Sequence, residues 1–234
     1  KQALTNDATI TDAAYQTGLC YANLGKYENA LRAFDKILEI TPHDAGILFQ
    51  KGKALARLLR YEEALTTLDD SLNSENNNAG VWELKGLMHY ELGQFAESLV
   101  AYDRAIALAE SHITWYRKGK ANRELGNYEE AISCFDRVLA VDDRCAGAWL
   151  RKGSSLLSLG RFEPAIESLT RALDLKPQNA NGWYDRGIAL AELGRNEEAV
   201  SSFDRAISIN RKYTNAWYDK GLALARLGKD RDAI

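Results

Sequence analysis

The chain has 234 residues, with 30 Lys and Arg against 33 Asp and Glu and a net charge of −3, so it lacks the general basic surface that nucleic-acid binding needs. No apolar run approaches the roughly 18 residues that would span a bilayer. The three cysteines, Cys20, Cys134 and Cys145, are odd in number and share no metal-ligand spacing, which indicates buried or partly buried side chains in a reducing compartment. The composition therefore predicts no nucleic-acid partner, no membrane partner and a cytoplasmic location.

Seven similar segments follow one another along the chain. In six of them, a bulky residue is followed four positions later by a glycine inside a helical stretch, then usually by a second glycine, an aromatic residue and a small residue; the first segment is weaker and has Ala14 at the bulky position. The first glycines are Gly18, Gly52, Gly86, Gly119, Gly153, Gly187 and Gly221, at spacings of 34, 34, 33, 34, 34 and 34 residues. A fixed period of this length predicts a stack of small repeated units, each touching its neighbours.

Each unit contains two helical patterns. In the sixth unit, the apolar residues of 180–193 and then of 197–209 recur at three- and four-residue steps, which predicts two amphipathic helices. Gly194 between them suits the left-handed conformation that ends many helices. No alternating β-branched run competes, so strands are not expected.

The first glycine of each unit lies inside a predicted helix, where glycine costs about 1 kcal/mol relative to alanine. We infer that a partner helix approaches too closely for a Cβ atom. We expect the small residues of the second helices to face these glycines, namely Ala30, Ala64, Ser98, Ala131, Ala165, Ala199 and Ala233. The preceding tryptophans would then fill the gap to the neighbouring unit.

This pattern resembles the tetratricopeptide repeat family, and the residues that carry the resemblance in the fourth unit are Trp115, Gly119, Gly126, Tyr128, Ala131 and Phe135. The resemblance covers nearly the whole chain and implies an all-α fold, a right-handed superhelical solenoid of antiparallel helix pairs. One departure is systematic, because Lys or Arg precedes the first glycine in six units, where the family often has Leu. We expect the stems of these side chains to lie on apolar surface with their charges in water.

The units are predicted at residues 11–44, 45–78, 79–111, 112–145, 146–179 and 180–213, with a partial seventh at 214–234. Residues 1–10 are expected to be the second-helix tail and loop of a preceding repeat, so the chain is interpreted as part of a longer array with soft or covered ends. Leu59 replaces the second glycine of the second unit. The third unit is one residue short near residues 109–112, which predicts an altered rotation there or a longer second helix.

The resemblance implies that the first helices line a concave groove, with five positions around each first glycine pointing inward. Tyr15 and Arg226 are among the aromatic and basic residues at these positions, and those that we expect to contact a ligand are Phe49, Lys53, Arg57, Tyr90, Tyr116, Arg117, Lys120, Arg123, Arg151, Tyr184 and Tyr218. Tyr and Arg are enriched among residues that carry binding energy, so we expect a protein or peptide ligand, whose acidic segment would lie against the basic middle of the groove. The alternative is that these residues form ordinary solvated helix faces.

The predicted function is that of a protein- or peptide-binding scaffold. The alternative is a structural self-assembly module that associates through uncapped ends or the convex face. We expect no enzyme activity, cofactor or metal, because His43, His89 and His112 are isolated and no phosphate-binding glycine loop is present.

Overall fold

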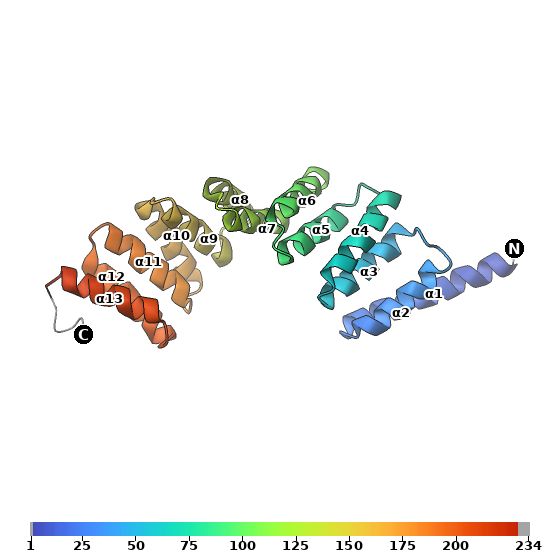
Figure 1. Cartoon of the computed structure of the whole chain (residues 1–234), viewed down its shortest axis with the longest axis horizontal. Helices are drawn as coiled ribbons and strands as arrows, with labels where there is room; N and C mark the ends of the chain where they lie inside the picture. The colour runs from blue at the N-terminus through green and yellow to red at the C-terminus, as the bar shows by residue number, and fades with distance from the viewer. Residues whose placement is uncertain (1, 229–234) are drawn as a thin grey trace. The chain divides into compact units, whose positions relative to one another are not determined.

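The computed structural model describes residues 2–228 of the chain, and side chains from Thr11 onward. Within that range the structure contains thirteen α-helices and no strand, which confirms the all-α prediction (Figure 1). The chain divides into two compact units, residues 1–114 and 115–234, and each is described by itself.

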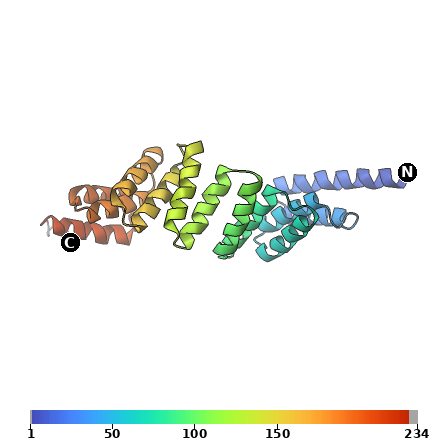
Figure 2. The same cartoon turned by 90° about the horizontal axis from the view of Figure 1, so that it is seen from above.

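Unit 1 is a stack of helix pairs. Its helices are α1 (Gln2–Asn23), α2 (Tyr27–Leu38), α3 (Ala45–Arg57), α4 (Tyr61–Ser74), α5 (Ala79–Glu91) and α6 (Phe95–Leu108). Each odd-numbered helix packs against the next helix of its pair, and α2 and α4 in turn pack against α3 and α5 (Figure 2). The core lies between these helices and includes Phe34, Leu68 and Met88, all essentially buried.

Unit 2 repeats the same arrangement. Its helices are α7 (His112–Glu124), whose first turn precedes the unit boundary, α8 (Tyr128–Val141), α9 (Ala146–Ser158), α10 (Phe162–Leu175), α11 (Ala180–Glu192), α12 (Asn196–Ile209) and α13 (Thr214–Arg226). The helices α9 and α10 form one pair and α11 and α12 another, and α8, α10 and α12 each pack against the next odd-numbered helix. The predicted helices at 180–193 and 197–209 are thus confirmed to within one residue at each end.

The two helices of each pair are joined by a tight turn, in which one residue has a left-handed backbone conformation. Gly25, Gly93, Gly126, Gly160, Gly194 and Gly228 all have φ between 70° and 77°, as predicted for Gly194. In the second repeat Leu59 occupies this position at φ 62° with its side chain exposed. The left-handed conformation places Cβ too close to the following carbonyl, so this residue is strained by about 1 kcal/mol.

The first glycines do allow close helix packing, but the prediction of what faces them was wrong. A Cβ atom at Gly153 would lie 2.6 Å from Leu169 Cγ, and one at Gly187 would lie 2.5 Å from Phe203 Cε1. The large residue sixteen positions after the glycine fills the space in every repeat for which the contact is described: Phe34, Leu68, Tyr102, Phe135, Leu169 and Phe203. The small residues expected there lie one turn earlier on the second helix and are fully buried elsewhere in the pair, namely Ala30, Ala64, Ser98, Ala131, Ala165 and Ala199. Ala233, the last of the expected set, lies outside the described residues.

The basic residue before the first glycine has two partners. In the fifth repeat Lys152 Nζ lies 2.6 Å from Asp136 of the preceding second helix and 5.3 Å from the centre of the Trp149 ring. Lys220 repeats both contacts, with Asp204 at 2.7 Å and Trp217 at 5.6 Å. The prediction that the stems lie on apolar surface is therefore supported by the tryptophan contacts, but the charges of these lysines meet carboxylates rather than water alone. Arg186 differs, because its guanidinium donates to the Thr170 and Ser202 hydroxyls.

The tryptophans lie against the turn that leads into their repeat. The indole Nε1–H of Trp149 donates to the Asp143 carbonyl at 2.8 Å, and that of Trp183 donates to the Pro177 carbonyl at 2.9 Å. Trp82 and Trp217 make the same bond to Asn76 and Arg211. These four tryptophans therefore join the start of their helices to the preceding turn, while the face of each ring receives the basic side chain.

Two further expectations are corrected, and one of two alternatives is excluded. Residues 2–10 continue α1 without a break, so the predicted loop within residues 1–10 is absent from the described part of that segment. The short third unit does not extend its second helix, because α6 ends at Leu108 and the deletion instead shortens the turn before α7 to residues 109–111. Cys134 is buried and Cys145 partly buried, as predicted, but Cys20 is exposed.

Candidate functional site

The candidate site is the first-helix face, meaning the residues of the odd-numbered helices at the five inward positions around each first glycine. In unit 1, Phe49, Lys53 and Arg57 lie one turn apart on α3. Lys53 Nζ is 5.4 Å from the centre of the Phe49 ring, and the same ring packs beside Gly80 at the start of α5. Lys53 and Arg57 are exposed, so α3 offers two cations beside an aromatic ring.

Tyr90, on α5, is held by its own helix pair. Its ring lies 5.3 Å from that of Phe95 in an edge-to-face arrangement. The contact holds the Tyr90 side chain against the start of α6, where it is partly buried.

In unit 2 the structure brings Tyr116 of α7 and Arg151 of α9 together. Arg151 Nε donates to the Tyr116 hydroxyl at 2.9 Å, and its guanidinium lies 5.8 Å from the centre of the same ring. The centre of the Tyr116 ring also lies 5.9 Å from that of Phe135 in an edge-to-face arrangement. These contacts fix the orientation of a basic side chain on the face before any ligand arrives.

A second contact joins α9 to α11. Ser154 Oγ donates to Asp185 Oδ2 at 2.5 Å. Burial raises the pKa of the Asp185 carboxyl above its ordinary value, while the Ser154 hydrogen bond and the charge of Arg123 act in the opposite direction. A carboxylate is therefore held inside the first-helix face, where it offsets part of the basic charge.

Arg123 lies at the same face of α7 and is partly buried. Its Nε atom is buried, and no residue in the described part of the chain accepts a hydrogen bond from it. A buried guanidinium N–H without an acceptor is costly, so this atom is a candidate contact for an anionic group. Arg117 and Lys120 on the same helix are also partly buried.

Tyr184 joins α11 to α13. Its hydroxyl donates to Asp219 Oδ2 at 2.8 Å, and its ring lies 4.9 Å from that of Tyr213. Burial first, and then the hydrogen bond to Asp219, raise the pKa of the Tyr184 hydroxyl. Tyr218, by contrast, is 68% exposed on α13, so two tyrosines at equivalent positions have opposite environments.

All eleven predicted residues lie on first helices, and the structure joins Phe49 to Lys53 and Tyr116 to Arg151. Ser154, Asp185 and Asp219 lie at the same predicted inward positions, but they were not among the eleven expected ligand contacts. They complete the contacts between successive first helices. Their positions around the first glycine were the available signal, but the pairing depends on the offset between neighbouring helices.

The described residues also bear on membrane insertion and metal binding. Residues 2–228 contain no helix whose length and apolar character would let it cross a membrane. Within the same residues no three His, Cys, Asp or Glu side chains gather in a way that would hold a metal ion.

Profiles described as tetratricopeptide repeat match residues 116–180, 150–213 and 184–234, and further profiles with the same description match residues 22–88 and 79–112. Together these matches cover most of the chain. The chain belongs to the tetratricopeptide repeat family. Among curated proteins no sequence matches.

Solved tetratricopeptide repeat structures share the fold at low sequence identity. YrrB, described as a tetratricopeptide repeat protein with an unusual peptide-binding site, has a TM-score of 0.74 and 21% identity over 80% of this chain and 97% of its own. A tetratricopeptide repeat protein from Parabacteroides merdae has a TM-score of 0.73 and 17% identity over 96% of this chain and 90% of its own. MamA from Desulfovibrio magneticus has a TM-score of 0.68 and 22% identity over 72% of this chain and 96% of its own.

Proposed function

We propose that this tetratricopeptide repeat chain is a binding scaffold that holds a protein or peptide along its first-helix face, with an acidic segment of the ligand lying against α7 and α9. The observation that carries the proposal is the buried Arg123 Nε, which lacks an acceptor among the described residues. A ligand carboxylate would supply that acceptor if the Arg123 side chain, which is partly exposed, turns its Nε toward the surface of α7. The peptide-binding site named for YrrB supports the general class of function.

The geometry around Arg123 favours an extended anionic segment. Arg151 is held in place by Tyr116, so its guanidinium loses little conformational freedom when a ligand binds. Asp185 and Asp219 already accept hydrogen bonds from Ser154 and Tyr184, so their oxygen atoms are engaged within the face. The segment would therefore bind toward the α7 side of unit 2, and the proposal involves no catalytic step.

The test is fluorescence anisotropy with a labelled peptide of ten glutamates, against Arg123→Gln. We expect the variant to bind at least tenfold more weakly, since a charge-assisted hydrogen bond is lost. The matched control is Arg171→Gln on α10, where the side chain is exposed, and it should bind like the wild type. Equal affinity of the Arg123 variant and the wild type, or no binding by either, would overturn the acidic-ligand proposal.

A second candidate function is self-assembly, favoured by exposed apolar side chains on α13. Trp217, Tyr218 and Leu222 are 52%, 68% and 43% exposed, and apolar patches of this kind mark association sites. Sedimentation over a hundredfold concentration range distinguishes the two functions. A mass that rises with concentration and stays monomeric in Tyr218→Glu would support assembly through α13.

A further inference from the structure

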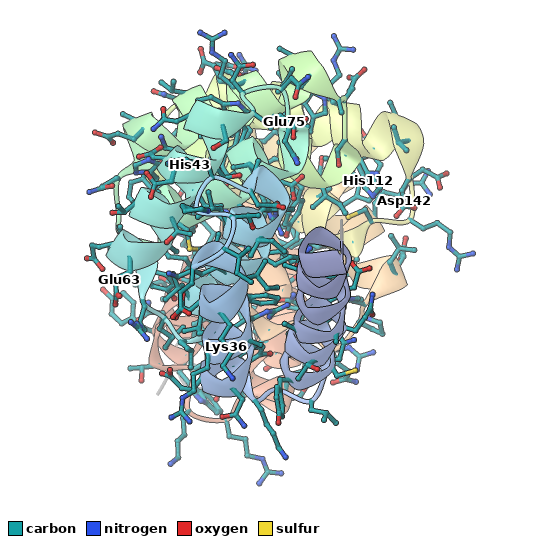
Figure 3. The ribbon with its side chains drawn as sticks, turned by 90° about the vertical axis from the view of Figure 1, so that its right-hand side faces the viewer. Lys36, His43, Glu63, Glu75, His112 and Asp142 are labelled. Carbon is teal, nitrogen blue, oxygen red and sulfur yellow. The ribbon has the colours of Figure 1, made fainter. Side chains whose placement is uncertain are left out.

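A recess of about 310 Å³ opens in unit 1 where the first repeat meets the second. Its lining comes from α1, the end of α2 and the start of α3, namely Thr11, Asp12, Tyr15, Ile37, Asp44, Gly46 and Ile47. Figure 3 labels His43, which lies in the turn between α2 and α3 and directly precedes Asp44. The recess therefore lies between two described repeats and not on the outer side of α1.

In other repeats this space is filled by the side chain three positions before the first glycine. A Cβ atom added at Gly80, at the start of α5, would lie 3.3 Å from Phe49 Cζ of the preceding first helix. The fourth and fifth repeats make the same contact at 3.0 Å. At Gly46, the equivalent residue of the second repeat, no atom of Tyr15 lies within 4 Å of an added Cβ atom. The Tyr15 ring thus borders the recess instead of closing it.

The floor of the recess is apolar and its rim is acidic. Ile37 and Ile47 are 2% and 7% exposed, whereas Asp12 and Asp44 are exposed. Asp44 caps α3, and its Oδ1 atom accepts a hydrogen bond from the Ile47 N–H at 3.0 Å. Neither carboxylate forms an ion pair with a Lys or Arg side chain among residues 11–228. Both charges are therefore available to a ligand.

The two carboxylates occur together only at this junction. They lie six positions before the first glycine of one repeat and eight positions before that of the next. The equivalent pairs at the other junctions are all uncharged: Gly46 and Asn78, Gly80 and Ser111, Ile113 and Cys145, Gly147 and Asn179, and Asn181 and Tyr213. Interior repeats also expose the first of these positions, at Ile113 and Asn181. The exposure of Asp12 therefore belongs to its position in the repeat, and the acidic rim belongs to this recess alone.

We propose that the recess binds a lysine side chain of a polypeptide ligand. The methylene groups of the lysine lie over Ile37 and Ile47. Its ammonium group, with three N–H donors, meets the carboxylates of Asp12 and Asp44 in charge-assisted hydrogen bonds. A lysine suits such a site because its apolar stem can be buried while its charge stays at the rim. The choice of a polypeptide rests on the proposed function, because Tyr15 lies at an inward position of the first-helix face.

The probe is a pentapeptide, Gly-Ser-Lys-Ser-Gly, with blocked ends, titrated into isotope-labelled protein and followed by NMR. The backbone amide signals of Gly46 and Ile47 report on the recess, because both residues line it. We expect these signals to shift to saturation with the lysine peptide. The matched control peptide contains Nε-acetyl-lysine, which keeps the methylene stem but has no charge, and it should bind at least tenfold more weakly.

Neutral variants test the acidic rim. Asp44→Asn removes a charge but keeps a helix cap, because Asn78 is itself the N-cap of α5. Asp12→Asn/Asp44→Asn should therefore bind the lysine peptide at least tenfold more weakly without losing stability in urea. The matched control is Asp70→Asn/Glu75→Gln, which removes two exposed negative charges of unit 1 outside the recess and should bind like the wild type.

A larger side chain tests the recess itself. Gly46→Ile places in the second repeat the residue that the fourth repeat carries at the equivalent position, Ile113. The variant keeps both carboxylates but occupies the space beside Tyr15. It should bind the lysine peptide at least fivefold more weakly, whereas general attraction to an acidic surface would leave the affinity unchanged.

Two cross-tests separate this inference from the proposed function. Arg123→Gln should bind the lysine peptide like the wild type, and Asp12→Asn/Asp44→Asn should bind the glutamate peptide no more weakly than the wild type. Equal binding of the acetylated peptide, equal binding of the neutral variant, or unmoved Gly46 and Ile47 signals would overturn the proposal. Shifts of these signals with protein concentration alone would also overturn it, because a second copy of the chain would then occupy the recess.

Discussion

Replacing Gly153 with alanine tests the packing of a helix pair directly. Alanine is favoured over glycine in a helix by about 1 kcal/mol, so an unhindered position would be stabilised. At Gly153 the added Cβ would lie 2.6 Å from Leu169 Cγ, 2.9 Å from its Cδ2 and 3.2 Å from its backbone nitrogen. Overpacking of this kind costs about 1–3 kcal/mol, so we expect a net loss of about 1 kcal/mol.

The partner side chain provides the internal control. Leu169 is fully buried, and Leu169→Ala alone should cost about 2–5 kcal/mol. In the double variant most of the clash is removed, although the backbone nitrogen of Leu169 stays close. The two losses should therefore fall short of additivity by about 1 kcal/mol.

Urea unfolding followed by circular dichroism measures each free energy of unfolding, with the slope checked because repeat arrays can depart from two-state behaviour. Gly160→Ala is the matched control. Its φ is 70° and the nearest atom to an added Cβ is 3.9 Å away, so it should lose about 1 kcal/mol from backbone strain and show no coupling to Leu169→Ala. A Gly153→Ala protein more stable than the wild type, or full additivity with Leu169→Ala, would refute the packing argument.

Three further predictions concern stability. Leu59→Gly should raise the free energy of unfolding by about 1 kcal/mol, because it relieves a left-handed leucine whose side chain is exposed; a lower urea midpoint than the wild type would show that the leucine is not strained. Asp136→Asn, which removes the partner of Lys152, should cost less than about 1 kcal/mol in low salt and almost nothing in 1 M salt; a loss that salt does not reduce would argue against an ion pair. Burial raises the pKa of Asp185 in the folded protein, so folding favours the protonated form of this carboxyl. The stability that this preference contributes is fully present below the unfolded pKa of about 4. It is lost as the pH rises through the folded pKa. The stability of Asp185→Asn relative to the wild type should therefore increase from about pH 4 to pH 7, and a constant difference would contradict the burial of the carboxyl.

The sequence predicted the helices because glycines and apolar residues recur in a fixed register. The helix bounds at Ala180–Glu192 and Asn196–Ile209 follow from this periodicity. The residue that faces each glycine could not be derived in the same way, since it depends on how far one helix is shifted along the other. The shift places Leu169, rather than Ala165, over Gly153.

For the candidate site, too, the sequence predicted the positions of residues but not the contacts between them. The positions of Tyr116 and Arg151 on first helices follow from the repeat register, but the hydrogen bond between them requires the offset between α7 and α9. The same holds for Ser154 and Asp185, which come from successive repeats. The exposure of Cys20 was also missed, because it depends on which helices pack against that position rather than on the local sequence.

The most direct test of the binding account is the arginine side-chain NMR spectrum of the protein, with each Hε signal assigned by substitution. On addition of the glutamate peptide, we predict that the Arg123 Hε signal moves downfield and exchanges with solvent more slowly, because its N–H gains a carboxylate acceptor. The Hε signal of Arg171, which is exposed on α10, should stay in place. Binding of the peptide with an unmoved Arg123 signal would contradict the account.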